Sequence, residues 1–334
     1  MRAFFIRRYG GPEVLEAGEL PPPPLGPRDV RIAVHAASVN PVDWKIRQGK
    51  AKVLLPYRFP LVLGNDCSGV VREVGAEVKA FKPGDAVYSR LGKDRIGAFA
   101  EEVVTAEANV APKPTGLTHA QAASLPLVAL TAWQALVDVA KVQRGQTVLV
   151  HAGAGGVGSA AVQLARHLGV KVVATASAKN QELVRGFGAD TVVDYNAQRF
   201  EEVVRDVDAV IDGVGQENVL RSFRCVRPGG IVISITDGPD LTFAREYGVT
   251  PLLWPVFWLL GAKANRAARR HQARYRYWFM IPNGEQLRHL TTLVDQGVLR
   301  PHVARVFPFA ETKEAVAYAE SGKASGKVVV SLRE

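Results

Sequence analysis

The sequence has very little cysteine and no long apolar segment near its start. Only two cysteines, Cys67 and Cys225, occur among 334 residues. They are too few for the disulfide framework of a small secreted domain, so we expect a reducing, cytoplasmic setting. The first apolar run, Ala3–Ile6, is shorter than the core of a signal peptide, and we predict no export. The composition, 47% hydrophobic and 22% charged, is that of a globular protein, and the length suggests two domains.

Grouped metal ligands are also missing. The seven histidines are scattered without the short spacings of a zinc site, and the two cysteines are isolated. We therefore predict no metal and interpret both thiols as small buried hydrophobic groups. Without a Lewis acid, alcohol oxidation loses its usual means of stabilising an alkoxide, which argues against an alcohol dehydrogenase.

Acidic residues are missing from one strongly basic segment. The chain has 42 Lys and Arg against 32 Asp and Glu, and residues 261–280 contain six basic residues and no acid. The preceding run, Leu252–Ala262, is uncharged, contains two tryptophans and is too short to span a bilayer. For this insertion, residues 249–272, we consider a lid, a subunit interface and a membrane contact, and we favour the first two. Nucleic acid is not expected, because no nucleic-acid-binding fold accompanies the basic residues.

Two patterns of secondary structure follow each other along the chain. Up to about residue 115, short β-type runs alternate with turns and predict an irregular β unit. After Thr118, which forms a capping box with Gln121, apolar strands alternate with helices and predict a parallel, doubly wound α/β sheet. The predicted strands of that sheet are Thr147–Val150, Val170–Thr175, Thr191–Val193, Asp208–Ile211 and Ile231–Ile235.

A glycine-rich loop follows the first strand of this sheet. Gly153, Gly155 and Gly158 fit the pattern G-x-G-x-x-G between that strand and a helix of small residues. Glycines in this place allow a tight turn, let backbone N–H groups approach a pyrophosphate and let the helix lie close to its strand. The predicted cofactor-binding residues of the loop are Gly153, Ala154, Gly155, Gly156, Val157 and Gly158.

The end of the second strand determines which dinucleotide is expected. NAD-binding proteins carry a carboxylate there for the ribose 2′-hydroxyl, whereas residues 174–180 contain no acid. Ser177 offers a hydroxyl and Lys179 a cation, and both suit a 2′-phosphate, so we predict NADPH rather than NADH. Tyr195, after the third strand, is a further candidate for the same phosphate. A solvated lysine at a helix start is the alternative interpretation of Lys179.

These features together resemble the medium-chain dehydrogenase/reductase superfamily, in its zinc-free quinone oxidoreductase and alkenal reductase branch. Beside the glycine loop, the stretches that carry the resemblance are Ser38–Lys45, Leu63–Val70, Phe81–Val87 and Leu125–Gln134. The resemblance implies a cofactor held in the cleft between two domains. The implied domains are a GroES-like β-rich catalytic domain (1–120), a Rossmann NADP-binding domain (121–281) and a C-terminal return (282–334) that completes the catalytic domain.

The resemblance also implies roles for single residues. Zinc-dependent relatives place a cysteine where Asn40 stands and His-Glu where residues 65 and 66 are Asn and Asp, so these ligands are absent here. Asn40 and Thr131 are implied to border the nicotinamide, although Asn40 also suits a turn before a proline. As donors to the carbonyl oxygen of the acceptor we nominate Lys45, Tyr57 and Tyr88, in that order.

The sequence thus predicts an NADPH-dependent, zinc-independent oxidoreductase that transfers a hydride to a quinone or another conjugated carbonyl compound. One alternative is a reductase of enone or 2-alkenal double bonds, and another is an NADPH-bound binding or scaffold protein with little turnover. Arg274–Met280 alternates large aromatic residues with others and is predicted as an edge strand that joins a homodimer.

Overall fold

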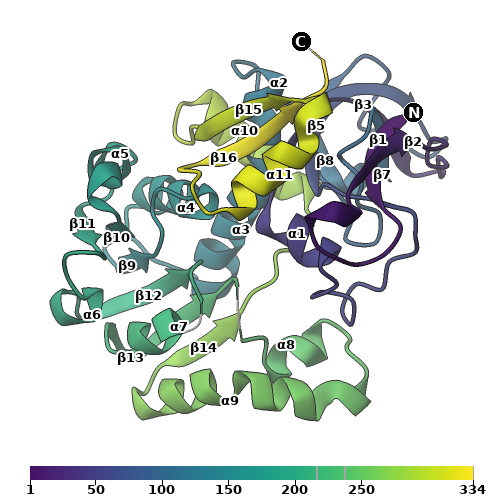
Figure 1. The fold of residues 1–334 in the computed structure, drawn as a ribbon. Helices are drawn as coiled ribbons and strands as arrows, with labels where there is room; N and C mark the ends of the chain where they lie inside the picture. The colour runs from purple at the N-terminus through teal and green to yellow at the C-terminus, as the bar shows by residue number, and fades with distance from the viewer. Residues whose placement is uncertain (216, 237, 334) are drawn as a thin grey trace. The chain divides into compact units, whose positions relative to one another are not determined.

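The computed structural model describes residues 1–215, 217–236 and 238–333. These residues divide into two compact units (Figure 1). Unit 1 joins residues 1–130 with residues 281–334, and unit 2 comprises residues 131–280. The chain passes from unit 1 to unit 2 within helix α3 (Pro126–Trp133) and returns to unit 1 after strand β14 (Arg274–Tyr277).

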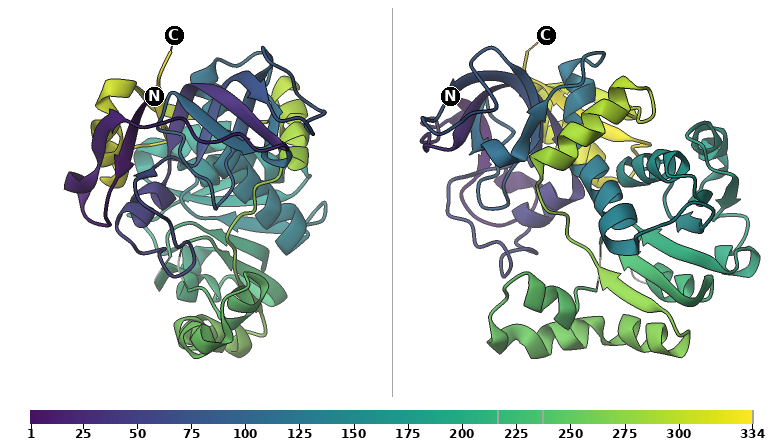
Figure 2. Two further views of the ribbon diagram at one scale, coloured as in Figure 1. Left: turned by 90° about the vertical axis from the view of Figure 1, so that its right-hand side faces the viewer. Right: turned by 180° about the vertical axis from the view of Figure 1, so that it is seen from behind.

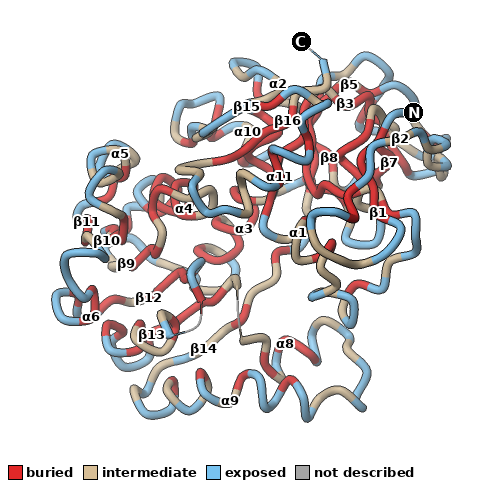
Figure 3. Tube along the Cα trace, viewed as in Figure 1, coloured by how far each residue is buried: buried red, intermediate tan, exposed pale blue. Residues whose placement is uncertain are grey.

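Unit 2 is built on a parallel sheet whose strand order is β11-β10-β9-β12-β13-β14. The inner strands are rich in valine and buried, because helices cover both faces of the sheet (Figure 3). This strand order is that of the doubly wound dinucleotide-binding fold. The other strands are β9 (Thr147–Val150), β10 (Lys171–Ala176), β11 (Thr191–Asp194), β12 (Val207–Asp212) and β13 (Val226–Ser234).

Helices connect these strands in the predicted alternation. The π-helical segment Gln134–Ala140 precedes β9, and the connecting helices are α4 (Gly156–His167), α5 (Gln181–Gly186), α6 (Phe200–Val203), α7 (Glu217–Ser222), α8 (Leu241–Glu246) and α9 (Trp254–Arg270). The sheet is confirmed: four of its first five strands lie within two residues of their predicted bounds, and β13 starts five residues earlier than predicted. The insertion forms α9, which lies beside β14 at the end of the sheet, and α8, just before the insertion, packs against α9 (Figure 2). The predicted edge strand is present, since β14 pairs with β13 alone among the described strands.

Unit 1 contains a large, mainly antiparallel sheet and a smaller one. The larger has the order β15-β16-β3-β5-β6-β8, with β7 also paired to β3, and the smaller has the order β2-β1-β4. The C-terminal strand β16 pairs with β3, so chain ends far apart in sequence meet in one sheet. The strands are β1 (Arg2–Ile6), β2 (Glu16–Glu19), β3 (Asp29–Val39), β4 (Leu61–Val62), β5 (Asp66–Val74), β6 (Ala86–Arg90), β7 (Glu102–Ala106), β8 (Val110–Pro112), β15 (Val303–Pro308) and β16 (Lys327–Ser331).

Helix α2 (His119–Ala123) of unit 1 begins at the polar cap that the sequence predicts. Gln121 N–H donates to Thr118 Oγ1 at 3.2 Å and Thr118 N–H to Gln121 Oε1 at 3.0 Å, which is the predicted capping box. Besides α2 and α3, the helices of unit 1 are α1 (Pro41–Arg47), α10 (Gly284–Asp295) and α11 (Thr312–Glu320). Within the described residues of the whole chain, no helix combines the length and apolarity needed to cross a membrane.

Candidate cofactor site and buried polar cluster

The glycine loop joins β9 to α4 at the carboxyl end of the unit 2 sheet. Gly155 is the N-cap of α4, and its N–H donates to Ala152 O at 2.8 Å. Gly153 N–H donates to Thr175 O at 2.8 Å, which ties the loop to β10. The first-turn amides of a helix have no acceptor within that helix, so the start of α4 presents donors and partial positive charge to an anion.

Two of the glycines make close contacts, and at Gly158 the contact requires a glycine. A Cβ on Gly158 would lie 2.1 Å from Ala152 O, and one on Gly153 would lie 3.1 Å from the Cβ of Ala174. The first separation is a backbone clash, and the second is tight against β10. The loop therefore lies against its strand and helix as a pyrophosphate-binding turn requires, and its residues fit a dinucleotide cofactor.

The residues predicted to contact a 2′-phosphate come from two adjacent strand ends. Ala176 of β10 pairs with Asp194 of β11, and Ser177 and Tyr195 follow these two residues directly. Lys179 lies in the turn after Ser177 and is exposed, as is Tyr195. Asp194 Oδ1 accepts from the N–H of the second residue after it at 2.9 Å, so this carboxylate is engaged in its own turn.

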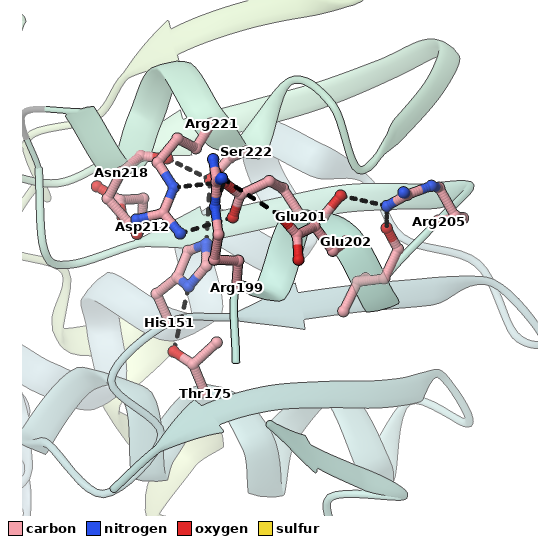
Figure 4. A network of polar contacts seen from close by, with 11 residues as sticks. His151, Thr175, Arg199, Glu201, Glu202, Arg205, Asp212, Asn218, Arg221 and Ser222 are labelled. Carbon is pink, nitrogen blue, oxygen red and sulfur yellow. Dashed lines mark hydrogen bonds and ion pairs between the residues drawn. The ribbon is translucent and has the colours of Figure 1, made fainter. Parts of the chain in front are cut away.

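A chain of buried hydrogen bonds fixes the start of the glycine loop (Figure 4). Ala152 has a left-handed φ of 52°, and its N–H donates to Thr175 Oγ1 at 3.2 Å. That oxygen lies 3.2 Å from His151 Nδ1, while His151 Nε2 lies 3.0 Å from Ser222 Oγ. Ser222 Oγ in turn donates to Asn218 O at 2.7 Å. One direction of donation satisfies every group when the imidazole is neutral with its proton on Nε2.

Burial is the main reason why the His151 imidazole stays neutral. Burial, with a smaller contribution from Arg221, lowers the pKa of His151 to about 3. Arg221 also pairs with the buried Glu201 at 2.6 Å, and Arg199 pairs with the same carboxylate at 2.9 Å. The hydrogen bond from Arg221 lowers the pKa of Glu201 to about 2. The Phe200 ring packs against His151, with ring centroids 4.5 Å apart, so α6 and α7 support the end of β9.

Unit 1 contains a second polar site, which we call the buried polar cluster: Ser38, Asn40, Asp43, Asn65, Asp66 and Lys327. Asp66 Oδ1 accepts from Ser38 Oγ at 2.6 Å and from Asn40 Nδ2 at 2.8 Å, and Asp66 Oδ2 accepts from Leu127 N–H at 3.1 Å. Lys327 Nζ donates to Val39 O at 3.0 Å and to Asn40 Oδ1. All six residues of the cluster are buried.

Asp43 and Asn65 complete the cluster. Asp43 Oδ2 accepts from Asn40 N–H at 2.7 Å, and Asp43 Oδ1 accepts from Asn65 Nδ2 at 2.6 Å. Burial raises the pKa of Asp43 to about 7, with a smaller contribution from the charge of Asp66. Burial also lowers the pKa of Lys327 against the opposing pull of the two carboxylates. The cluster therefore balances its charges internally.

Zinc does not fit this cluster, which includes the three positions where, according to the resemblance, zinc-dependent relatives place ligands. Among the described residues, no group of three or more His, Cys, Asp or Glu side chains is arranged to hold a metal ion. The oxygen of Asn40 already accepts from the Lys327 ammonium, and both oxygens of Asp66 accept hydrogen bonds. A divalent cation here would face that ammonium in a medium of low dielectric constant.

The structure places the nominated proton donors in different surroundings. The Tyr88 hydroxyl is buried, donates to Leu287 O at 2.9 Å and accepts from Thr291 Oγ1 at 3.0 Å. Burial also raises the pKa of Tyr88. Because the core uses this hydroxyl both as a donor and as an acceptor, we withdraw its nomination. Tyr57 donates to Lys93 O at 2.6 Å from a half-buried position.

The other three residues with implied roles near the nicotinamide or the acceptor are Lys45, Thr131 and Asn40. Lys45 is half-buried on α1, and Thr131 is buried on α3. Asn40 is the N-cap of α1, before Pro41, and its side chain belongs to the buried polar cluster. Both interpretations of Asn40 therefore keep a basis, the turn residue and the residue beside the cofactor.

Some site residues escaped the sequence analysis. His151 was only one of seven scattered histidines there, and Lys327 was not singled out. The signal for Lys327 is a lysine directly before the buried run Val328–Val330. No local pattern marks the partners of His151, because they come from β10 and α7.

Comparison with known proteins finds related families and relatives for both parts of the chain. The family described as alcohol dehydrogenase GroES-like domain matches residues 26–115, and the family described as zinc-binding dehydrogenase matches residues 187–330. The chain is 37% identical to the NAD(P)H oxidoreductase RTN4IP1, mitochondrial, of Mus musculus, over 99% of this chain and 89% of that protein. It is 35% identical to the NADPH-dependent alkenal/one oxidoreductase, chloroplastic, of Arabidopsis thaliana, over 99% and 79%.

A solved structure gives the same likeness in three dimensions. The quinone oxidoreductase from Coxiella burnetii superposes with a TM-score of 0.87 at 33% identity, and the match covers 100% of this chain and 99% of that one. Similarity to these proteins therefore extends over both units.

Proposed function

Because this chain belongs to the quinone oxidoreductase-like branch of the medium-chain dehydrogenase/reductase superfamily, we propose that it is an NADPH-dependent, zinc-independent reductase of quinones. It is an oxidoreductase with a nicotinamide cofactor. The acceptor, the preference for NADPH and the independence of zinc are the parts that we propose.

The observation that carries the proposal is the end of the unit 2 sheet. The tight loop before α4, the clash that any side chain at position 158 would cause, and the helix N-terminus together suit a pyrophosphate. The proposed loop contacts are Gly153, Ala154, Gly155, Gly156, Val157 and Gly158. The chain's own part is to hold this turn in one conformation, which the hydrogen bonds of Thr175 and His151 do.

The preference for NADPH is supported by the adjacent ends of β10 and β11. Ser177, Lys179 and Tyr195 supply two hydroxyls and one cation there. A 2′-phosphate gains charge-assisted hydrogen bonds from such groups, whereas the 2′-hydroxyl of NADH lacks the charge. The name of the Arabidopsis relative includes NADPH dependence, which agrees with this proposal.

The proposed acceptor is an electron-poor carbonyl compound. When bound, the reduced nicotinamide supplies a hydride; with one proton, a quinone gains two electrons and becomes a hydroquinone. The protein holds the acceptor, excludes water and donates a hydrogen bond to the oxygen that gains charge. We propose Lys45 as that donor. Tyr57 is second, because it is only half-buried, although its hydroxyl would have to leave Lys93 O; Tyr88 is fully buried.

Asn40 and Thr131 are proposed to border the nicotinamide, as the resemblance implies. Lys327, Asp66 and the N-cap geometry hold the Asn40 side chain in one orientation. We therefore propose that Asn40 positions the cofactor ring by its fixed shape.

The loss of NADPH absorbance with a panel of quinones and enones tests the proposal. We expect turnover with quinones, and we expect Lys45→Met to lower kcat more than KM. A purified, folded protein that binds NADPH but reduces none of these acceptors would instead support a binding or scaffold protein with little turnover. Reduction of enones alone would support the alternative reaction, hydride addition to the β-carbon of a C=C bond and proton addition to the α-carbon. That alternative is favoured by the name of the alkenal/one oxidoreductase relative.

We also propose a homodimer joined through β14. This strand pairs on one side with β13 and is an edge strand of the described sheet. Pairing with the same strand of a second copy would satisfy its outer N–H and C=O groups. Light scattering should give twice the chain mass, and a monomer at micromolar concentration would refute this proposal. The cytoplasmic location also stays a proposal, based on the low cysteine content.

A further inference from the structure

Helix α9 has two faces whose residues recur at the same helical spacing. One face is buried and the other is exposed. Its buried face consists of Phe257, Gly261, Ala264 and Ala268, which recur at i, i+4, i+7 and i+11. Small residues there let α9 lie close to the rest of unit 2: a Cβ on Gly261 would lie 2.3 Å from the Cβ of Asp240. Phe257 packs against Phe243 of α8 with ring centroids 6.2 Å apart. The helix is therefore a firmly packed part of unit 2.

The opposite face of α9 is exposed and changes character along the helix. Leu259, Lys263, Arg266 and Arg270 recur at the same spacing on this outer side, and all four are exposed. The first two turns are apolar and the last two are basic. We define the outer face of α9 as Leu252, an exposed residue of the 3-10 turn before the helix, together with the exposed helix residues Val256, Trp258, Leu259, Leu260, Lys263, Arg266, Arg269 and Arg270.

The apolar part of this face is unusually concentrated. Leu252 is 85% exposed, Leu259 68% and Trp258 63%. Five of the twelve large hydrophobic residues that are exposed in the described chain fall within nine consecutive positions, 252–260. A cluster of exposed apolar groups in such a short segment marks an interaction surface rather than scattered surface residues.

The charge next to this apolar surface has one sign. The sequence contains no acidic residue between Glu246 and Glu285, and Glu246 is paired with Arg276. Among the described residues, none of the four basic side chains of the outer face has a carboxylate within ion-pair distance. A second copy of this helix would bring like charges together, whereas a surface of phosphates would neutralise them.

We propose that the outer face of α9 binds the surface of an anionic lipid bilayer. Its apolar first turns enter the boundary between headgroups and acyl chains, and its basic last turns contact lipid phosphates. A helix in this orientation lies in the interface, which agrees with the absence of a membrane-crossing helix among the described residues. The structure thus favours the third role considered for the insertion, which the sequence alone ranked below a lid or a subunit interface. This inference does not depend on the proposed reaction.

The test is sedimentation of the full chain with vesicles. Phosphatidylcholine vesicles are compared with vesicles that contain phosphatidylcholine and phosphatidylglycerol. We expect binding to the anionic vesicles only, and salt should weaken it. The combined variant Lys263→Glu, Arg266→Glu, Arg269→Glu and Arg270→Glu should lower the affinity at least about 100-fold.

A matched control reverses four exposed lysines of unit 1, with the same change in net charge. It consists of Lys79→Glu, Lys82→Glu, Lys313→Glu and Lys323→Glu, and it should bind the vesicles at nearly the parent's affinity. If both fourfold variants lose binding equally, only the net charge matters, and the proposal fails.

A second pair of variants tests the apolar half. Trp258→Ser with Leu259→Ser should weaken vesicle binding at least about tenfold, because two large apolar side chains no longer enter the bilayer. Brominated acyl chains should quench the tryptophan fluorescence of the vesicle-bound parent. The quenching should be weaker in the Trp258→Phe variant. No binding to anionic vesicles would overturn the proposal. So would a change from dimer to monomer in the apolar variant, or a higher KM for large quinones in the absence of vesicles.

Discussion

The buried polar cluster of unit 1 and the glycine-loop end of the unit 2 sheet differ in what they leave unpaired. In the cluster, Asp66 and Asn40 share their hydrogen bonds with neighbouring side chains, and Lys327 counters two carboxylates. At the glycine loop, backbone donors at the start of α4 and the exposed Lys179 face outward. Apart from Asn65 Oδ1, which is buried without a hydrogen-bond partner among the described residues, the cluster pairs its polar groups internally, whereas the glycine-loop region is arranged for an anion.

We propose that this difference lets a fold related to zinc-binding dehydrogenases work without zinc. The ammonium of Lys327 supplies the positive charge that Asp66 and Asp43 need, and it comes from the chain itself. The glycine loop between β9 and α4 has the close backbone contacts that a pyrophosphate-binding turn requires. We expect changes in the cluster to affect stability, and changes at the loop to affect cofactor affinity.

The largest effect is expected for Lys327→Met. This change removes the buried ammonium and leaves the carboxylates of Asp66 and Asp43 without an opposite charge. The free energy of unfolding should therefore fall by about 3–5 kcal/mol. Urea unfolding measures this loss, and Lys323→Met, an exposed lysine four residues earlier, is the control. Adding Asp43→Asn to Lys327→Met should restore part of the loss. A variant as stable as the parent would show that the cluster does not need this cation.

Gly158→Ala should have the next largest effect, and on binding. The new Cβ would clash with Ala152 O, so the loop must move, and NADPH affinity should fall at least 100-fold, about 2.7 kcal/mol. Calorimetric titration gives the affinity, and circular dichroism verifies that the variant is folded. Gly186→Ala, where the added Cβ has no neighbour within 4 Å, is the control. Unchanged affinity in a folded Gly158→Ala variant would contradict the assigned turn.

The pH dependence of stability separates the two regions further. Burial raises the pKa of Asp43 from 3.8 to about 7, so the folded state holds a proton that the unfolded state releases. The stabilisation that comes from this raised pKa is therefore full below about pH 4 and is lost as the pH rises through about 7. The free energy of unfolding should fall by about 2 kcal/mol between pH 5 and 7.5. Asp43→Asn should remove this slope relative to the parent, whereas Asp94→Asn, at an exposed site, should keep it. Parallel profiles for parent and Asp43→Asn would mean that Asp43 is ionised throughout.

Lys179→Ala should have the smallest of these effects. The parent should bind NADPH at least tenfold better than NADH, about 1.4 kcal/mol, and the variant should lose most of that preference. Lys171→Ala, at the opposite end of β10, should leave the ratio of the two dissociation constants unchanged. Equal affinities of the parent for both cofactors would refute the assignment of the 2′-phosphate site.

The glycine-loop region could be predicted because its signals are local. The loop, its strand and its helix lie within residues 147–167, and spacing alone identifies them. The same holds for the Thr118 capping box and the alternation of strands and helices in unit 2. Such features depend on backbone conformations that only certain residues adopt, so the residue types reveal them.

The buried polar cluster could not be predicted in the same way. Asn40 and Lys327 are 287 positions apart and meet only because β16 pairs with β3. Tyr88 was nominated as a donor because its residue type suits proton transfer, but α10 buries its hydroxyl. Helix α9 showed its composition in the sequence, while the separation of its buried and exposed faces needed the packing against α8.

The activity of metal-depleted protein tests most directly whether the buried polar cluster makes zinc unnecessary. The rate of NADPH oxidation with an accepted quinone is measured before and after prolonged dialysis against a chelator, together with the zinc content of tag-free protein. We predict the same rate in both preparations and no stoichiometric zinc, because Lys327 already neutralises the position. Stoichiometric zinc that is lost together with activity, and activity that returns when zinc is added back, would contradict this account.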